Sequence, residues 1–199
     1  MIIHAPGIVS PGSSDPASYP KAVITAAEFF SAWQSVTTPQ SVRLIELWND
    51  RKPYTQMVLN DGSCILREVG AKVGLQCYSR NYYHVDGMLY LEEDFVPGRR
   101  EGSYWLRGIR VAFEHEHKFN KRLYEEISHL LLIQADLRVV VSYPPGDGED
   151  LLPYFHSIIA GSSSAEILHD QAGFLMILGH RDPFAWRGLV FTRERWLEI

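Results

Sequence analysis

The chain has 199 residues, 46% hydrophobic and 22% charged, a composition typical of one globular domain long enough to bury a core. Its net charge of −5 argues against a protein that coats nucleic acid through bulk electrostatics, although a local basic groove is compatible with it. No apolar run approaches the roughly 20 residues that cross a bilayer. The first residues show no secretory pattern, and Cys64 and Cys77 form no paired motif. We therefore expect a cytoplasmic protein without a membrane partner.

The first elements in chain order are a tail and a helix. Residues 1–22 are rich in Pro, Ser, Gly and Asp and lack hydrophobic periodicity, so we expect a tail or arm before a single domain. Thr25 and Glu28 form a capping box that predicts the start of an amphipathic helix, and Pro39 ends it. Residues 42–48 fit a strand or a helix equally well.

A second helix and three strands are predicted next. Ser63 is placed to cap a helix that Gly74 closes. Residues 82–90 are aromatic and β-branched with partial alternation, and residues 104–116 alternate more cleanly. Residues 138–143 form the nearly continuous apolar run that is typical of a strand buried on both faces.

Between the last two strands lies an amphipathic helix. Its apolar face carries Leu123, Ile127 and Leu130, so the succession of strand, helix and buried strand predicts parallel pairing of the two strands. A helix near residues 150–160 and two closing strands follow, at residues 174–179 and 186–192. The order predicts an α/β fold, a central mixed β-sheet flanked by helices.

Two acids in the strand at residues 104–116 are the first candidates for chemistry. Side chains alternate along a strand, so Glu114 and Glu116 point to one face, with Lys118 beyond them. Neighbouring carboxylates repel unless a cation lies between them, and Mg²⁺ prefers such oxygen ligands. For an isolated Glu-x-Glu, two solvated side chains at a strand end are the simpler interpretation.

Asp86 strengthens the metal interpretation. It lies within an apolar segment, where a carboxylate without a partner is costly to bury. Gly87 beside it has no side chain and would admit a close neighbour. An Asp-Gly turn between two short strands is the alternative.

These features together resemble the PD-(D/E)XK nuclease superfamily, whose fold is called restriction-endonuclease-like. The resemblance covers residues 63–143: an acid in one strand, an acid-x-(Lys or Glu) on a second about thirty residues later, then an amphipathic helix and a buried strand. A helix before the first strand often adds an acid in that superfamily, and Glu68 occupies the matching place. Two positions depart from the pattern, with Val85 where proline is common and Glu116 where lysine is usual.

The resemblance implies a single nuclease-like domain that hydrolyses phosphodiester bonds with Mg²⁺ or Mn²⁺, its substrate a nucleic acid and DNA the first choice. Asp86 and Glu114 would hold the metal, and Glu116 would share it or orient the attacking water. Glu68 would hold a second ion, and Lys118 would stabilise charge on the phosphoryl group. A homodimer would suit the cutting of both strands of a duplex.

Two other functions stay open. His84, His115 and His117 would suit Zn²⁺ if the strands bring them together, although the face of His115 is more typical of packed core histidines. A nuclease-fold protein that has lost its chemistry and acts as a binding module also fits the acidic charge and the absent lysine. Basic residues crowd the region around the acidic pair and fit either a solvated face or a phosphate-binding one: Arg99, Arg100, Arg107, Arg110, Lys118, Lys121 and Arg122.

Overall fold

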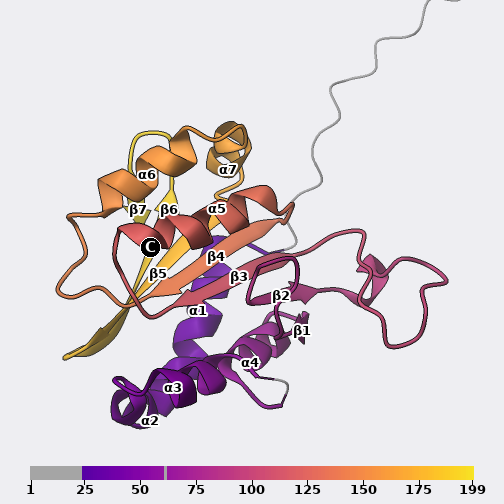
Figure 1. Cartoon of the computed structure of the whole chain (residues 1–199), viewed down its shortest axis with the longest axis horizontal. Helices are drawn as coiled ribbons and strands as arrows, with labels where there is room; N and C mark the ends of the chain where they lie inside the picture. Colours follow the sequence, from indigo (N-terminus) through magenta and orange to yellow (C-terminus); the bar gives the residue numbers. More distant parts are fainter. Residues whose placement is uncertain (1–23, 61) are drawn as a thin grey trace, which may run out of the picture.

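The computed structural model describes residues 24–60 and 62–199 as a seven-stranded mixed sheet with helices on both faces (Figure 1). The predicted tail at residues 1–22 lies outside the described residues. The strands, in the order in which they pair, are β1 (Gln76–Tyr78), β2 (Gly87–Tyr90), β3 (Val111–Glu116), β4 (Leu137–Ser142), β5 (Phe174–Arg181), β6 (Phe184–Phe191) and β7 (Trp196–Glu198). The α-helices are α1 (Ala26–Thr37), α2 (Ser41–Leu47), α3 (Arg51–Val58), α4 (Ile65–Lys72), α5 (Tyr124–Leu132), α6 (Leu152–Ala160) and α7 (Ala165–Asp170).

Parallel strands form the middle of the sheet and antiparallel strands form both margins. β3, β4 and β5 pair in parallel, which confirms the predicted crossover through α5. β1 and β2 extend the sheet beyond β3, and β6 and β7 extend it beyond β5, all by antiparallel pairing. The mixed α/β architecture is therefore as expected.

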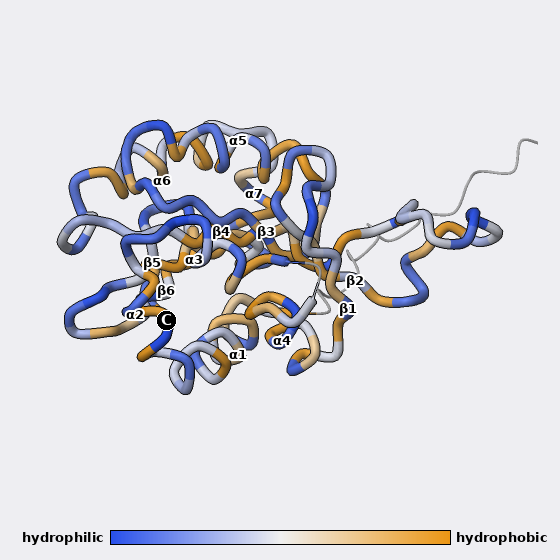
Figure 2. The backbone as a smooth tube through the Cα atoms, turned by 60° about the horizontal axis from the view of Figure 1, so that its bottom comes forward, coloured by the Kyte–Doolittle hydropathy of each residue, from blue (hydrophilic) through white to orange (hydrophobic). Residues whose placement is uncertain are grey.

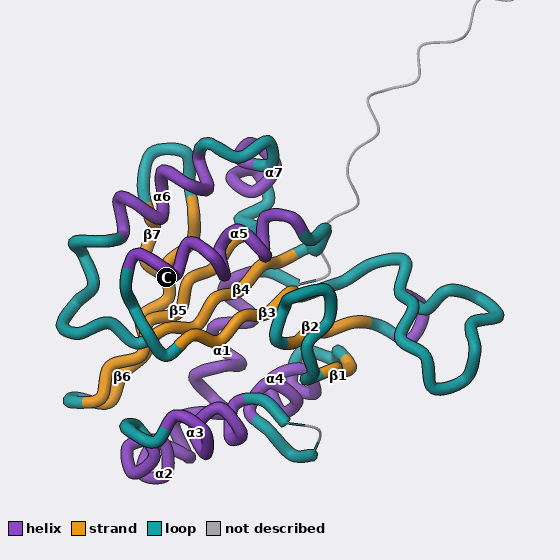
Figure 3. Tube along the Cα trace, viewed as in Figure 1, coloured by secondary structure: helices purple, strands orange, loops and turns teal. Residues whose placement is uncertain are grey.

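Two hydrophobic layers cover the sheet. Helices α1 to α4 lie on one face, and α5, α6 and α7 lie on the other (Figures 1 and 3). On the first face Trp33 packs against Phe113, with ring centroids 5.8 Å apart. On the second face Ile127 and Leu130 of α5 are fully buried in one cluster with Ala112 of β3. In the tube coloured by hydropathy, the hydrophobic segments run through the central strands (Figure 2).

The strands predicted at residues 82–90 and 104–116 begin later in the structure than expected. Tyr82 to Val85 form a tight turn, in which Tyr83 and His84 both have positive φ angles of 49° and 72°, so β2 begins only at Gly87. Residues 91–110 leave the sheet as a long projecting loop between β2 and β3 (Figure 3). Aromatic residues of this loop pack on one another and on the neighbouring strands instead of forming a strand. The ring centroids of Phe95 and Tyr104 are 6.0 Å apart, and those of Tyr104 and Tyr78 of β1 are 4.2 Å apart.

Helix starts were predicted with mixed success. The Thr25–Glu28 capping box is present, with the Glu28 amide 3.2 Å from Thr25 Oγ1. Ser63 is not the cap of α4, because Cys64 takes the N-cap position without a side-chain hydrogen bond. The undecided segment 42–48 is helical and forms most of α2, where Leu44 is fully buried. Within the described residues, no helix is long and apolar enough to cross a bilayer.

Candidate metal centre

The pairing of β2 with β3 brings Asp86 opposite Glu114. Gly87 pairs with Phe113, so the next residue pair along the two strands is Asp86 and Glu114. Asp86 Oδ2 accepts a hydrogen bond of 3.0 Å from the backbone amide of His115. Both carboxyl groups belong to the face covered by α5, because Ala112, two residues before Glu114, lies in the α5 layer. Asp86 therefore lies directly before β2, and the turn that precedes it is formed by Tyr82 to Val85 rather than by the Asp-Gly pair.

Helix α4 lies close to Gly87, as the absence of a side chain at this position suggested. A Cβ atom at this position would lie 2.7 Å from Leu66 Cδ2 of α4, on the opposite face from Asp86. The glycine thus lets α4 approach the sheet directly behind the acidic pair.

Helix α5 adds two polar side chains, Glu126 and His129, that the sequence patterns did not indicate as site residues. His129 Nδ1 lies 3.7 Å from Glu114 Oε1 and 3.4 Å from Glu126 Oε2. Glu126 and His129 are three residues apart and therefore adjacent on the helix surface. Both residues border the apolar face of α5 that packs on β3. Their position beside this packed face is the feature of the sequence that could have indicated them as site residues.

Burial disfavours the ionised form of these carboxyl groups. Glu114 is 1% exposed, and burial, followed by the charges of Asp86 and Glu126, raises the pKa of its carboxyl group to about 10. Burial likewise raises the pKa of Asp86 and that of Glu126 above their ordinary values. Several carboxyl groups thus share a poorly solvated space in which only a cation or protons relieve their repulsion.

The donor set fits a divalent cation. One ligand atom from each of Glu114, Glu126 and His129 lies within 4.8 Å of the others. Ligands bound at about 2.0–2.1 Å from a shared ion are separated by about 3–3.5 Å, close to the two distances measured at His129. Glu114 Oε1 and His129 Nδ1 are both buried without a hydrogen-bond partner, so each has a lone pair or proton available toward the shared space.

Glu116 and Lys118 lie at the rim of this group. Glu116 is half-buried, and its Oε1 accepts a hydrogen bond of 2.7 Å from the backbone amide of Lys118. Both residues line a groove of about 400 Å³, together with Glu126 and Arg51. The Lys118 side chain is exposed there. Its ammonium group therefore shares the groove with Glu116 but is not packed among the acidic side chains.

Glu68 is not brought to this group. It lies on α4, which packs on the other face of the sheet, and it accepts hydrogen bonds from Gln40 (3.2 Å) and Ser63 (3.3 Å). A side chain on that face cannot reach the α5 face through a packed sheet. The structure therefore supplies Glu126, and not Glu68, as the additional acid beside Asp86 and Glu114.

The three histidines of the alternative zinc site are separated by the sheet. His115 Nε2 lies 2.8 Å from the Tyr143 hydroxyl, and burial lowers the pKa of His115 to about 3. His117 lies beside it on the same face, with its ring centroid 4.8 Å from that of His115. His84 instead lies next to His129 on the α5 side, with ring centroids 5.7 Å apart.

Much of the basic cluster is occupied by local interactions. Arg110, which directly precedes β3, forms ion pairs with Asp94 and Asp136 and lies away from Glu114. Arg122 pairs with Glu125 at 3.1 Å. The cluster is therefore divided between the projecting loop and the groove beside Glu116.

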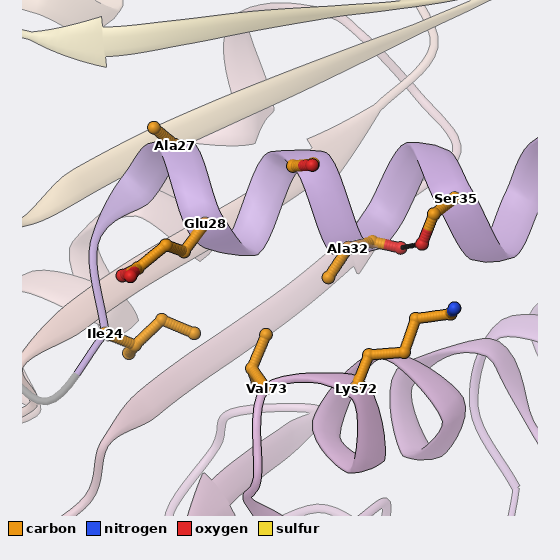
Figure 4. Close-up of a pocket in the computed structure, with 8 residues that line it drawn as sticks. Ile24, Ala27, Glu28, Ala32, Ser35, Lys72 and Val73 are labelled. Carbon is orange, nitrogen blue, oxygen red and sulfur yellow. Dashed lines mark hydrogen bonds between the residues drawn. The ribbon is translucent and has the colours of Figure 1, made fainter.

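A separate hollow of about 650 Å³ lies away from the acidic group. It lies between α1 and α4 and is lined mainly by small or apolar side chains such as Ala27, Ala32 and Val73 (Figure 4). The polar groups drawn there include Ser35, whose hydroxyl donates to the Ala32 carbonyl at 2.8 Å. This hollow is on the face opposite α5 and is separate from the acidic group.

Comparison of the chain with protein-family models, with curated proteins and with solved structures finds no match. The function is therefore inferred from the geometry of the site itself.

Proposed function

We propose that the chain is a metal-dependent phosphodiester hydrolase with a restriction-endonuclease-like core, acting on DNA. The succession α4, β1, β2, β3, α5, β4 supports this proposal, because it follows the order of elements that the resemblance predicts. One acid lies directly before β2 and the next lies on β3, and the crossover helix α5 covers both.

The observation that carries the proposal is the state of Glu114. An acid that is 1% exposed, without a basic partner in direct hydrogen-bond contact and beside two further acids, destabilises the fold unless it serves a ligand. A divalent cation is the ligand that best uses Glu114 Oε1, Glu126 and His129 together. Carboxylates with one imidazole suit Mn²⁺ or Zn²⁺ at least as well as Mg²⁺, so Mn²⁺ is the ion to test first.

The residues of the site divide into metal ligands and residues that act on the substrate in this proposal. Glu114, Glu126 and His129 would bind the cation directly, with Asp86 completing the set. When bound, such an ion polarises a phosphoryl oxygen and lowers the pKa of coordinated water. Glu116, half-buried at the rim, would orient the attacking water, and Lys118 would neutralise charge on the phosphoryl group as it transfers.

A catalytically silent binding module is the second candidate, and one observation favours it. The side chain at the position where the resemblance predicts lysine is Glu116, and Lys118 is exposed rather than packed beside Glu114. Calorimetric titration with Mn²⁺, Mg²⁺ and Zn²⁺ separates the candidates, because absence of binding at millimolar metal favours the silent module.

Cleavage of labelled single- and double-stranded DNA, with RNA in parallel, tests the hydrolase directly. We expect Mn²⁺-dependent cutting by the wild type and its loss in Asp86→Asn and Glu114→Gln. The matched control is Glu166→Gln, an exposed acid on α7 paired with Arg193. Cutting by both site variants at the wild-type rate would rule out the assignment.

A further inference from the structure

A second hollow lies at the carboxyl ends of β3 and β4. His117 directly follows β3, and Tyr143 directly follows β4. The hollow has a volume of about 210 Å³ and is lined by Trp48, Asn49, Arg51, Tyr54, His117 and Tyr143. Arg51 and His117 also line the groove that contains Glu116, so the two spaces adjoin. Ligands of open α/β sheets commonly bind at this end of the strands.

The walls of this hollow are aromatic. The Tyr143 ring is stacked with the His117 ring, at 5.4 Å between centroids and an interplanar angle of 26°. The Trp48 ring meets Tyr143 edge-on at 5.2 Å. Trp48 and His117 are only half-buried, so parts of both rings are accessible from the hollow. Accessible aromatic rings are the surfaces on which unpaired bases stack.

One buried polar atom beside these walls lacks a partner. His115 is 7% exposed and lines the adjoining groove, and its Nδ1 atom makes no hydrogen bond. The Tyr54 hydroxyl, buried in the hollow itself, has Tyr143 as its polar neighbour. Buried polar groups are normally paired, so the unpaired His115 nitrogen at the groove favours a polar ligand there. Asn49, exposed at the rim, adds an amide that can pair with the edge of a base.

Cationic side chains stand where the two spaces adjoin. Arg51 and Lys118 are exposed, and neither side chain forms a hydrogen bond or ion pair within residues 24–60 and 62–199. Arg122 in the same groove is different, because it is paired with Glu125. Two cations without partners beside an aromatic hollow match a ligand that has a planar ring and a phosphate.

We propose that the aromatic hollow is a nucleotide subsite, in which a base contacts Trp48 and His117 while its phosphate lies between Arg51 and Lys118. The identification of the ligand as part of a nucleic acid strand rests on the proposed function. A base held here leads its phosphate into the groove that contains Glu116. An unpaired base is required, so the substrate is a single strand or the unpaired end of a duplex.

Binding without metal tests this subsite. The full chain, in buffer containing EDTA, is titrated by calorimetry with deoxyadenosine 5′-monophosphate, deoxyribose 5-phosphate and inorganic phosphate. We expect the nucleotide to bind at least about tenfold more tightly than deoxyribose 5-phosphate, because only the nucleotide stacks. Arg51→Ala should weaken both by about tenfold, through loss of a charge-assisted hydrogen bond. Trp48→Leu should weaken only the nucleotide.

The control is Lys52→Ala, which removes an exposed cation from the same helix outside the hollow and should leave binding unchanged. If Trp48→Leu fails to fold, the exposed Arg51 still provides the test. Equal affinity for the nucleotide and deoxyribose 5-phosphate, or no binding of either, would overturn the subsite. Nothing is cleaved in EDTA, so nucleotide binding by a protein that cuts no substrate with metal would count against the hydrolase alone.

Discussion

Replacing Glu114 by glutamine should stabilise the metal-free protein while removing its response to metal. The ordinary pKa of a glutamate side chain is 4.5, and in the fold that of Glu114 is raised to about 10. Between these values the folded protein keeps a proton on Glu114 that the unfolded chain releases. The free energy of unfolding therefore falls as pH rises through this window, by about 1.4 kcal/mol for each pH unit.

At pH 7 this loss in the free energy of unfolding reaches about 3 kcal/mol, because pH 7 lies 2.5 units above the ordinary glutamate pKa of 4.5. Glutamine has nearly the same shape and no charge to suppress, so Glu114→Gln should gain about 1–3 kcal/mol at pH 7 and nothing below pH 4.5. Asp86, Glu116, Glu126 and His129 lie around the same space and are present in both proteins, and burial raises the pKa of Asp86 and of Glu126 in each. The difference between the two proteins therefore isolates Glu114.

Urea denaturation from pH 5 to pH 8 in EDTA measures this difference, with Glu166→Gln as the exposed control. Addition of Mn²⁺ at a hundredfold excess over its dissociation constant should then stabilise the wild type by about 2.7 kcal/mol and leave Glu114→Gln unchanged. Parallel pH profiles for wild type and variant, or a variant less stable than wild type at pH 8, would refute the reasoning.

Three further predictions follow from individual contacts. His129→Ala should weaken Mn²⁺ binding by about tenfold or more in calorimetry, since it removes a donor 3.7 Å from Glu114, and unchanged affinity would exclude His129 as a ligand. Gly87→Ala should lower the free energy of unfolding by about 1–3 kcal/mol, because its Cβ would meet Leu66 at 2.7 Å; Gly108→Ala, with 3.7 Å of clearance, is the neutral control, and equal effects would contradict this. Thr25→Ala should cost about 1 kcal/mol by removing the cap of α1, and an unchanged urea midpoint would show that the capping box contributes nothing.

Features that depend on residues close together in the sequence, such as helix caps and amphipathic segments, could be predicted from the sequence. The capping box of α1 depends on two residues three apart, and the structure contains it. The apolar run of β4 and the amphipathic α5 before it predicted a parallel crossover, which β3 and β4 form. The long loop between β2 and β3 escaped prediction because its aromatic residues mimic a strand, whereas they pack on one another and on the aromatic side chains of β1 and β2.

Strand alternation alone places Glu114 and Glu116 on one face of β3, because the backbone geometry of a strand fixes it. Which side chains meet these two acids depends on how the other elements pack against β3. The register of β2 against β3 placed Asp86 beside Glu114, and the seating of Ile127 and Leu130 on the sheet turned Glu126 and His129 toward the same point. The same packing left Glu68 on the other face. How a helix is rotated on a sheet depends on non-local packing, and the spacing of residues along the chain does not specify it.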